Sequence, residues 1–179
     1  EEVTDAMRRE AKVLNFGIIY GMGAYGLAQA AKIDQKHASE FIKGYLKKFA
    51  GVAQYMETMK QFVKAHGYVE TEMGRRRALP EIESGNIALV RAAERMAINM
   101  PIQGLAADIV KLAMLGSREL LKRYTGKATL LLQIHDELIF EVDEAIAEEF
   151  GQELKKVMES AYTLKVPLLI SPDTGNTAG

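Results

Sequence analysis

Two apolar runs near the end of this 179-residue sequence constrain its fold more than any other feature. The runs are ATLLLQI, residues 128–134, and LIFEV, residues 138–142, and only the polar tripeptide HDE separates them. Short apolar runs that are bounded by polar turn residues predict β-strands. Because so short a connection leaves the second strand beside the first and running the opposite way, the two runs predict an antiparallel hairpin.

Most of the remaining sequence has the apolar spacing of three and four residues that is typical of amphipathic helices. The predicted helices cover residues 4–21, 25–32, 34–49, 52–66, 86–100, 102–124 and 144–160, with a break at Pro101. Further short strands are predicted at 68–71 and 165–170. Helices combined with separate antiparallel strands predict an α+β fold, with a mostly helical lobe over residues 1–67 and a lobe of packed helices and a small antiparallel sheet over residues 68–179.

The composition argues against several classes of protein. With 48% hydrophobic residues, the chain can bury a substantial core. It has no cysteine, which excludes a disulfide framework and a thiolate metal site. Its first residues are acidic, so we expect no secretory leader, and no apolar run approaches the roughly 18 residues of a membrane helix. These features predict a cytosolic or organellar protein without a membrane partner, and of the two we expect a cytoplasmic one.

Positive charge is concentrated in the first half of the chain, although the net charge is only −1. Residues 1–80 carry 13 Lys and Arg against 9 Asp and Glu, whereas residues 81–179 carry 10 against 15. The net charge argues against a general coat for nucleic acid. A surface that binds phosphate is therefore expected in the first half.

The stretch RREAKVLNFGIIYG places two cations and two aromatic rings four residues apart, at Arg8, Lys12, Phe16 and Tyr20. Four residues turn an α-helix by about 400°, so these side chains share one stripe about 18 Å long. A nucleoside triphosphate would fit such a stripe, because it has several negative charges at one end and a flat apolar body at the other. An ordinary amphipathic helix with exposed cations and buried rings has the same spacing, so the stripe alone leaves both interpretations open.

Asp136 and Glu137 lie at the turn of the predicted hairpin, where two apolar strands support them. Carboxylate oxygens are preferred ligands of Mg²⁺, and two-metal phosphoryl transfer needs such carboxylates beside the reacting oxygens. Asp also favours turns for purely structural reasons. The pair is a candidate metal site that one hairpin does not complete.

Two further groups of polar residues are candidates for contact with nucleic acid. The stretch GRRR contains a basic turn, Arg75 to Arg77, which could hold backbone phosphate or be a solvated surface turn. The residues Arg95, Asn99 and Gln103 are spaced four apart and offer donors along one side of a helix, as readout of a nucleic-acid groove requires.

Four stretches of the sequence, in order, resemble motifs of DNA polymerase family A, the family of bacterial DNA polymerase I. RREAKVLNFGIIYG resembles the motif of the fingers helix, and QIHDELIFEV resembles the palm motif that contains His-Asp-Glu. Between them, YVETEMGRRRALP and RAAERMAINMPIQGLAADIVK are similar to intervening segments of the family. The resemblance covers residues 2–170, nearly the whole chain.

This resemblance implies a DNA-directed DNA polymerase that joins a dNTP to the 3′-hydroxyl of a primer and releases pyrophosphate, in DNA replication or repair. Arg8 and Lys12 would contact the triphosphate, Phe16 would contact the sugar and base, and Tyr20 would stack near the templating position. Lys12 could also act as general acid toward the leaving pyrophosphate. The side chains implied to contact primer–template DNA are Arg75, close to the primer end, and Arg95, Asn99 and Gln103, along the minor groove.

The resemblance also implies a metal site at the hairpin. Asp136 would bind catalytic Mg²⁺, Glu137 would support that site, and His135 would lie near the primer terminus. The complete enzyme would use two Mg²⁺ ions.

Two alternatives stay open. A single-subunit RNA polymerase shares a Lys and a Tyr-Gly in its fingers helix and a His-Asp in its palm, but NFG and the Glu after His-Asp favour the DNA enzyme. The other alternative is a catalytically inactive module that binds nucleic acid.

Two departures from the family pattern lead to further expectations. The family's first palm motif, which carries the other metal-binding aspartate, has no match in residues 1–7. We therefore expect a C-terminal piece of a polymerase that begins inside the fingers, is inactive alone, and has the thumb and upstream palm of the remaining chain as its partner. The ending SPDTGNTAG also departs from the family's usual Gly-x-Gly-Glu-Asn-Trp ending.

Overall fold

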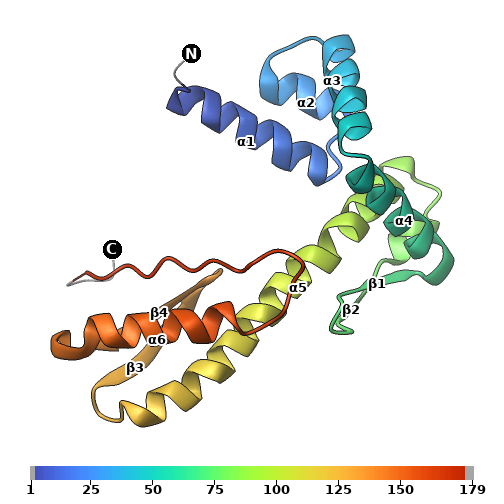
Figure 1. The fold of residues 1–179 in the computed structure, drawn as a ribbon. Coiled ribbons are helices and arrows are strands. Elements are labelled where there is room, and N and C mark those ends of the chain that lie inside the picture. Colours follow the sequence, from blue (N-terminus) through green and yellow to red (C-terminus); the bar gives the residue numbers. More distant parts are fainter. Residues whose placement is uncertain (1–2, 176–179) are drawn as a thin grey trace. The chain divides into compact units, whose positions relative to one another are not determined.

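Helices make up most of the structure, a computed structural model that describes residues 3–175 apart from the side chains of residues 5, 6, 9 and 10. Figure 1 shows the elements, which in chain order are α1 (Asp5–Ile19), α2 (Ala24–Ala31), α3 (Gln35–Lys48), α4 (Ala50–His66), β1 (Tyr68–Glu70), β2 (Arg76–Ala78), the 3₁₀ helix η1 (Pro80–Glu83), α5 (Ile87–Arg123), β3 (Ala128–Ile134), β4 (Glu137–Val142), the 3₁₀ helix η2 (Glu144–Ile146) and α6 (Ala147–Glu159). The described strands form two separate antiparallel sheets, β1–β2 and β3–β4. The predicted α+β fold is confirmed.

Local signals set the ends of the first helices. Thr4 Oγ1 accepts a hydrogen bond from the Met7 amide at 3.2 Å and caps α1, and the Asp34 carboxylate caps α3 in the same manner. Gly67 ends α4 with φ of 73°, a left-handed conformation that favours glycine. Such caps satisfy backbone groups that a helix end leaves unpaired, and they confirm the helices predicted before residue 67.

The chain divides into two compact units, residues 1–103 and residues 104–179, and α5 runs through both. The lobe boundary predicted at residue 67 falls inside the first unit. The reason is a core that joins α4 to β1 and α5, in which Val63, Val69 and Ala97 are fully buried. Residue 67 therefore does not separate compact units, and the assignment of fingers and palm to either side of it stays a prediction.

A second core of the first unit joins α1, α2 and α3. Its buried residues are Ile18, Leu27, Ala28 and Ala38. Because Ile18 lies in α1, this core fixes the helix that carries the stripe of cations and rings.

Helix α5 continues through Pro101, where the sequence predicts a break. A proline inside a helix lacks an amide donor and crowds the carbonyl one turn earlier, at a cost of about 3 kcal/mol. Packing on both sides holds the helix, since Ile98 is buried before the proline and Leu120 after it. The hydroxyl of Tyr55 in α4 also donates to the Ile98 carbonyl at 2.8 Å. Tertiary contacts therefore override the local break.

Helix α5 is also long and apolar enough to cross a membrane by length and composition alone, since one 18-residue window has a mean hydropathy of 1.2. The sequence predicts no membrane span. Core helices of soluble proteins meet the same criteria, and α5 contributes Ala93 and Ala97 to one core and Leu120 to another. Packing thus accounts for part of its apolar character.

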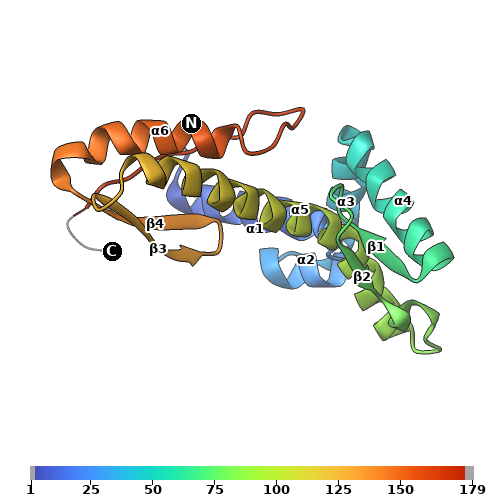
Figure 2. The same ribbon diagram turned by 90° about the horizontal axis from the view of Figure 1, so that it is seen from below.

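In the second unit, β3 and β4 form the predicted hairpin, which packs with α5 and α6 (Figure 2). The pairing runs from Ala128 opposite Val142 to Ile134 opposite Glu137. The buried centre of this unit consists of Leu120, Ala128 and Phe150. The hairpin prediction is confirmed, and its two-residue connection is held by strands that are anchored in a core.

The strand predicted at residues 165–170 is wrong, because this segment forms no ladder with any strand that the structure describes. Pro167 has no amide to donate. The Ile170 amide donates instead to Glu159 Oε1 at 3.0 Å. The segment is held against α6 by this side-chain contact.

Candidate functional site

The stripe predicted on α1 forms a chain of contacts. The Lys12 ammonium lies 5.8 Å from the centre of the Phe16 ring, within range of a cation–π interaction. The rings of Phe16 and Tyr20 stack with their centres 5.8 Å apart and their planes at 29°. Arg8, two turns before Phe16, is exposed on the same helix. Among the described residues, no acidic side chain forms an ion pair with Arg8 or Lys12.

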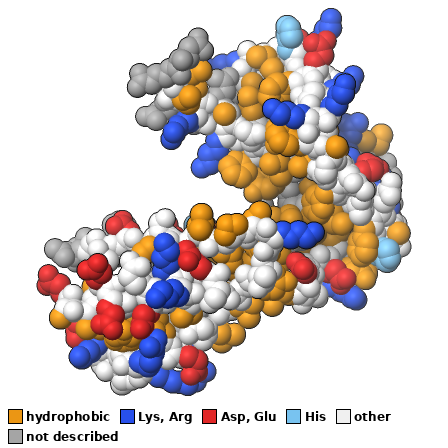
Figure 3. Space-filling view, in the orientation of Figure 1, with side chains coloured by type: hydrophobic (Ala, Val, Ile, Leu, Met, Phe, Trp, Pro, Cys, Tyr) orange, Lys and Arg blue, Asp and Glu red, His pale blue; other side chains and the backbone are white. Residues whose placement is uncertain are grey.

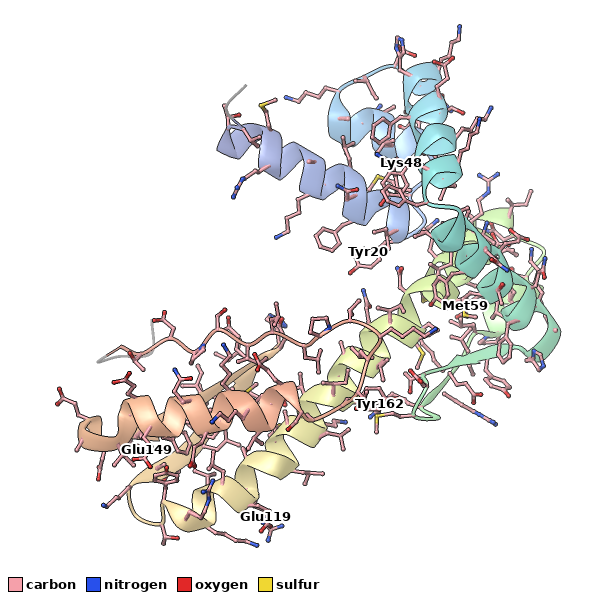
Figure 4. All side chains as sticks on the ribbon, viewed as in Figure 1. Tyr20, Lys48, Met59, Glu119, Glu149 and Tyr162 are labelled. Atoms are coloured by element: carbon pink, nitrogen blue, oxygen red, sulfur yellow. The ribbon has the colours of Figure 1, made fainter. Side chains whose placement is uncertain are left out.

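Both rings of the stripe are accessible to a ligand. Phe16 is 46% exposed and Tyr20 is 36% exposed, whereas their neighbour Ile18 is 1% exposed. Figure 4 shows Tyr20 projecting from the C-terminal end of α1. The alternative in which the rings are buried and only the cations are exposed is therefore wrong.

A cleft of about 690 Å³ lies beside these rings. Its walls come from the C-terminal half of α1, the glycine-rich loop after it, α2 and the first part of α5. Gly21 in this loop has φ of 78°, and a Cβ atom there would lie 3.2 Å from Arg95 Cγ. Glycine at this position therefore permits the close approach that brings Arg95 to the same cleft as Phe16 and Tyr20.

The cleft favours a negatively charged ligand. Three charged side chains of α5 line it, namely Arg91, Glu94 and Arg95. Lys64 of α4 pairs with Glu94 at 2.7 Å, and this hydrogen bond is the main reason why the pKa of Lys64 is raised. Neither arginine pairs with a described acidic side chain. Because the one carboxylate is already neutralised, the two arginines leave the cleft with excess positive charge.

The row of donors predicted on α5 is continuous, because the helix does not break at Pro101. Arg95 and Gln103 are exposed, and Asn99 is half-buried. The Oδ1 atom of Asn99 is buried without a hydrogen-bond partner in the described part of the chain. Buried polar atoms normally have a partner, so this acceptor is an unusual feature of the row. The contact of these residues with DNA stays a prediction.

In the basic turn predicted to hold phosphate, Arg76 and Arg77 make side-chain contacts within the protein. Arg76 pairs with Glu70 at 2.8 Å and lies 4.6 Å from the centre of the Tyr68 ring. Arg77 approaches the Met96 sulfur at 3.3 Å. The Arg75 amide donates to the Thr71 hydroxyl at the turn. Its predicted position near the primer end is not tested by these contacts.

The β3–β4 hairpin presents its polar tip to solvent. His135 and Asp136 form the two-residue connection, and Glu137 pairs with Ile134 at the first position of β4. All three polar side chains are exposed. His135 has φ of 53°, which non-glycine residues rarely adopt, and its carbonyl accepts a hydrogen bond from Gln133 Nε2 at 3.2 Å. The backbone at the tip is thus held in one tight conformation.

Comparison with known proteins decides the family. The family described as DNA polymerase family A matches residues 1–179. This chain belongs to DNA polymerase family A. The recognition made from the four motifs is confirmed.

Relatives of this family A chain are DNA polymerase I of Bacillus caldotenax, 50% identical over 177 residues, and that of Bacillus subtilis (strain 168), 50% identical over 175 residues. The matches cover 99% and 98% of this chain and 20% of each relative, so the chain spans about one fifth of their length. A solved structure, described as the POL domain of Pol1 from M. smegmatis in complex with DNA primer-template and dNTP, is similar with a TM-score of 0.89 and 44% identity. That match covers 95% of this chain and 30% of the other.

Asp136 and Glu137 at the hairpin tip are the candidate metal ligands. Within residues 3–175, no three His, Cys, Asp or Glu side chains are grouped so as to hold a metal ion. The donors at the hairpin tip are two carboxylates, which suit Mg²⁺ chemically. Mg²⁺ is commonly held by one or two carboxylates together with substrate phosphates, so Asp136 and Glu137 fit a site that other groups complete.

Sequence reasoning missed Arg91 and the ion pair of Glu94 with Lys64. Arg91 lies one helical turn before Arg95, so the spacing that singled out Arg95, Asn99 and Gln103 also extends to it. The pairing of Glu94 had no such signal, because Lys64 is 30 residues away in the sequence.

Proposed function

We propose that this chain supplies the nucleotide-binding part and one side of the metal site of a DNA-directed DNA polymerase that acts in DNA replication or repair. The observation that supports this most directly is the accessible stripe of cations and rings beside a positively charged cleft, in a chain of family A. Residues 1–67 would belong to the fingers and residues 68–179 to the palm. The partners would be primer–template DNA, a dNTP and the remainder of the polymerase chain.

The α1 stripe would bind the incoming dNTP along its length. Arg8 and Lys12 would contact the triphosphate, which as an anion is also favoured by the positive N-terminal end of the helix dipole. Phe16 would pack on the sugar and base, and Tyr20 would stack near the templating position. The distance of Lys12 from Phe16 suits a ligand that spans both.

The DNA would be contacted by side chains of α5 and the basic turn. The proposed contacts are Arg75 near the primer end and Arg95, Asn99 and Gln103 along the minor groove. Hydrogen bonds from such donors to groove edges and sugars position the duplex.

In the reaction, the 3′-oxygen of the primer attacks the α-phosphorus of the dNTP. A new P–O bond forms, the bond to the β-phosphate oxygen breaks, and pyrophosphate leaves. Lys12 can donate a proton to the leaving pyrophosphate. Asp136, supported by Glu137, would hold Mg²⁺, which lowers the cost of the negative charge at the attacking and leaving oxygens. His135 would lie beside the primer terminus.

The match to a family of DNA polymerases favours this function over a single-subunit RNA polymerase. An experiment must distinguish this polymerase from the other alternative, an inactive module that binds nucleic acid. A bacterial enzyme of this type would act in the cytoplasm.

The test is primer extension by the full-length gene product that contains these residues. We expect template-dependent dNTP incorporation that Asp136→Ala abolishes while binding of primer–template is retained. A matched control is Asp173→Ala, which removes an exposed carboxylate far along the sequence from the hairpin. Binding of DNA without any incorporation by the unaltered protein would instead indicate the inactive module.

A further inference from the structure

The side chain of Met22 lies between two glycines from two different helices. A Cβ atom at Gly17 in α1 would lie 3.0 Å from both Sδ and Cε of Met22, and a Cβ atom at Gly26 in α2 would lie 2.9 Å from its Cγ. Carbon atoms that are not bonded do not pack closer than about 3.5 Å without repulsion. The thioether of Met22 therefore fills space that any larger side chain at either glycine would need.

The backbone of Met22 is tied to the same helix. The Met22 amide donates a hydrogen bond to the Gly17 carbonyl at 2.8 Å. The preceding amide, that of Gly21, donates to the Ile18 carbonyl. The half-buried side chain packs against the core of α1, α2 and α3. Met22 also lines the cleft together with Phe16. One residue thus contacts both helices and borders the proposed nucleotide site.

We propose that Met22 is a positioning residue for the nucleotide site, because its side chain joins α1 to α2 and so fixes the rings of Phe16 and Tyr20 at the cleft. This inference rests on the proposed function. An unbranched thioether is suited to a narrow, irregular gap, whereas a branched side chain would meet one glycine or the other. Glycine at position 17 disfavours the helix that contains it. Because the Met22 side chain occupies the space beside this position, the packing explains why a glycine is present there.

The packing can be tested by a double-mutant cycle in the full-length gene product. Gly26→Ala should disturb the contact more than Gly17→Ala, because Cγ is nearer to the Met22 backbone than the flexible Sδ and Cε atoms are. Adding Met22→Ala to Gly26→Ala should remove the clash. The double variant should therefore lose less free energy of unfolding than the sum of the losses in the two single variants. Gly44→Ala in α3 is the matched control, since no atom lies near its Cβ position.

The first readout is amide hydrogen exchange, which does not depend on polymerase activity. Met22→Ala should speed exchange in residues 13–20 and in α2, and should leave the β1–β2 hairpin unchanged. The second readout is steady-state kinetics, in which Met22→Ala should raise the KM for dNTP by roughly tenfold, since small displacements of a binding group can cost up to about 100-fold. The Kd for primer–template should stay the same, and Met22→Leu should recover only part of the KM.

The possible outcomes separate this inference from the proposed function. Unchanged exchange in residues 13–20, or strictly additive effects of Gly26→Ala and Met22→Ala, would overturn the positioning role. Faster exchange with an unchanged KM in an active enzyme would also overturn it and leave Met22 a purely structural residue. If the unaltered protein incorporates no dNTP, the proposed function fails, and the exchange and the cycle still decide whether Met22 fixes α1.

Discussion

Single side chains on α1 combine charge and apolar surface along one stripe. Lys12 is the centre of this arrangement, because it lies one turn from Arg8 and within 5.8 Å of the Phe16 ring centre. An exposed lysine without a described acidic partner gains little from folding alone. Its role in the proposed function is to bind a ligand that carries negative charge.

Lys12→Ala in the full-length gene product should weaken the use of dNTP strongly. Charge-assisted hydrogen bonds contribute about 1.5–3 kcal/mol, and more where charge develops in the transition state, so kcat/KM should fall at least tenfold. Steady-state and single-turnover kinetics measure the effect. Lys43→Ala, an exposed lysine of α3, is the control and should change neither parameter. An unchanged kcat and KM for Lys12→Ala would show that the stripe is not part of the nucleotide site.

At the scale of helices and strands, α5 makes a close contact with a neighbouring helix in each unit. In the first unit, Tyr55 of α4 bonds to Ile98 of α5. In the second unit, a Cβ atom at Gly116 of α5 would lie 2.8 Å from Val157 Cγ1 of α6. Because α5 contributes to both units, a substitution at one of these contacts tests the packing of the unit that contains that contact.

Gly116→Ala should destabilise the packing of α5 against α6, although alanine favours a helix more than glycine does. Overpacking of this kind costs about 1–3 kcal/mol. Hydrogen exchange in α6 measures the change, and the double variant Gly116→Ala with Val157→Ala should recover part of it. Gly44→Ala, with open space around its Cβ position, should instead stabilise α3 by about 0.5–1 kcal/mol. If Gly116→Ala and Gly44→Ala changed stability equally, the close contact between position 116 and Val157 would be contradicted.

Tyr55→Phe should change how stability depends on alkaline pH. Burial raises the pKa of the Tyr55 hydroxyl from 10.0 to about 12. Between these two values the unfolded chain has lost the proton and the folded chain retains it, so folding loses stability as pH rises. The contribution of the hydroxyl, about 0.5–1.5 kcal/mol from its hydrogen bond, should be complete below pH 10 and should decline toward pH 12.

Unfolding free energies of the unaltered protein and of the Tyr55→Phe variant at several pH values measure this contribution as a difference. A difference that stays constant from pH 8 to pH 12 would contradict a raised pKa. Tyr25→Phe is a control, because Tyr25 is 70% exposed. Its difference should be close to zero below pH 10.

At the scale of the whole molecule, the stripe that we propose binds nucleotide belongs to the first unit and the carboxylate pair to the second. Acidic and basic side chains are interspersed over the part of the second unit that α6 forms (Figure 3). The stripe cations Arg8 and Lys12 lie in the basic half of the sequence, residues 1–80, whereas the cleft arginines Arg91 and Arg95 lie in the acidic half, although all four belong to the first unit. The proposed function would therefore need both units.

The 179-residue polypeptide, produced alone, should not extend a primer. Two metal ions roughly 3.5–4 Å apart must be held together for the reaction, and the described residues offer one pair of carboxylates at a hairpin tip. A primer-extension assay on the purified polypeptide measures this directly, with the full-length gene product as the positive control. Template-dependent incorporation above a mock preparation would show that the hairpin carboxylates suffice.

The sequence by itself determined the features that depend on local physical chemistry. Helix periodicity, the caps at Thr4 and Asp34, the stop at Gly67 and the hairpin around Asp136 act over a few residues, so they can be recognised without a partner segment. The motifs that place the chain in family A are local as well. The spacing of the stripe is local too, but it left open whether the rings of Phe16 and Tyr20 are exposed or buried.

Only the tertiary structure decided the features that depend on distant segments. Helix α5 continues through Pro101 because buried residues on both sides and the hydroxyl of Tyr55 hold it, and residues 165–170 form no strand because no described strand pairs with them. The place of Arg91 at the cleft and the gap filled by Met22 likewise depend on how helices approach one another. Periodicity shows which residues share a face, whereas close packing between helices determines what that face meets.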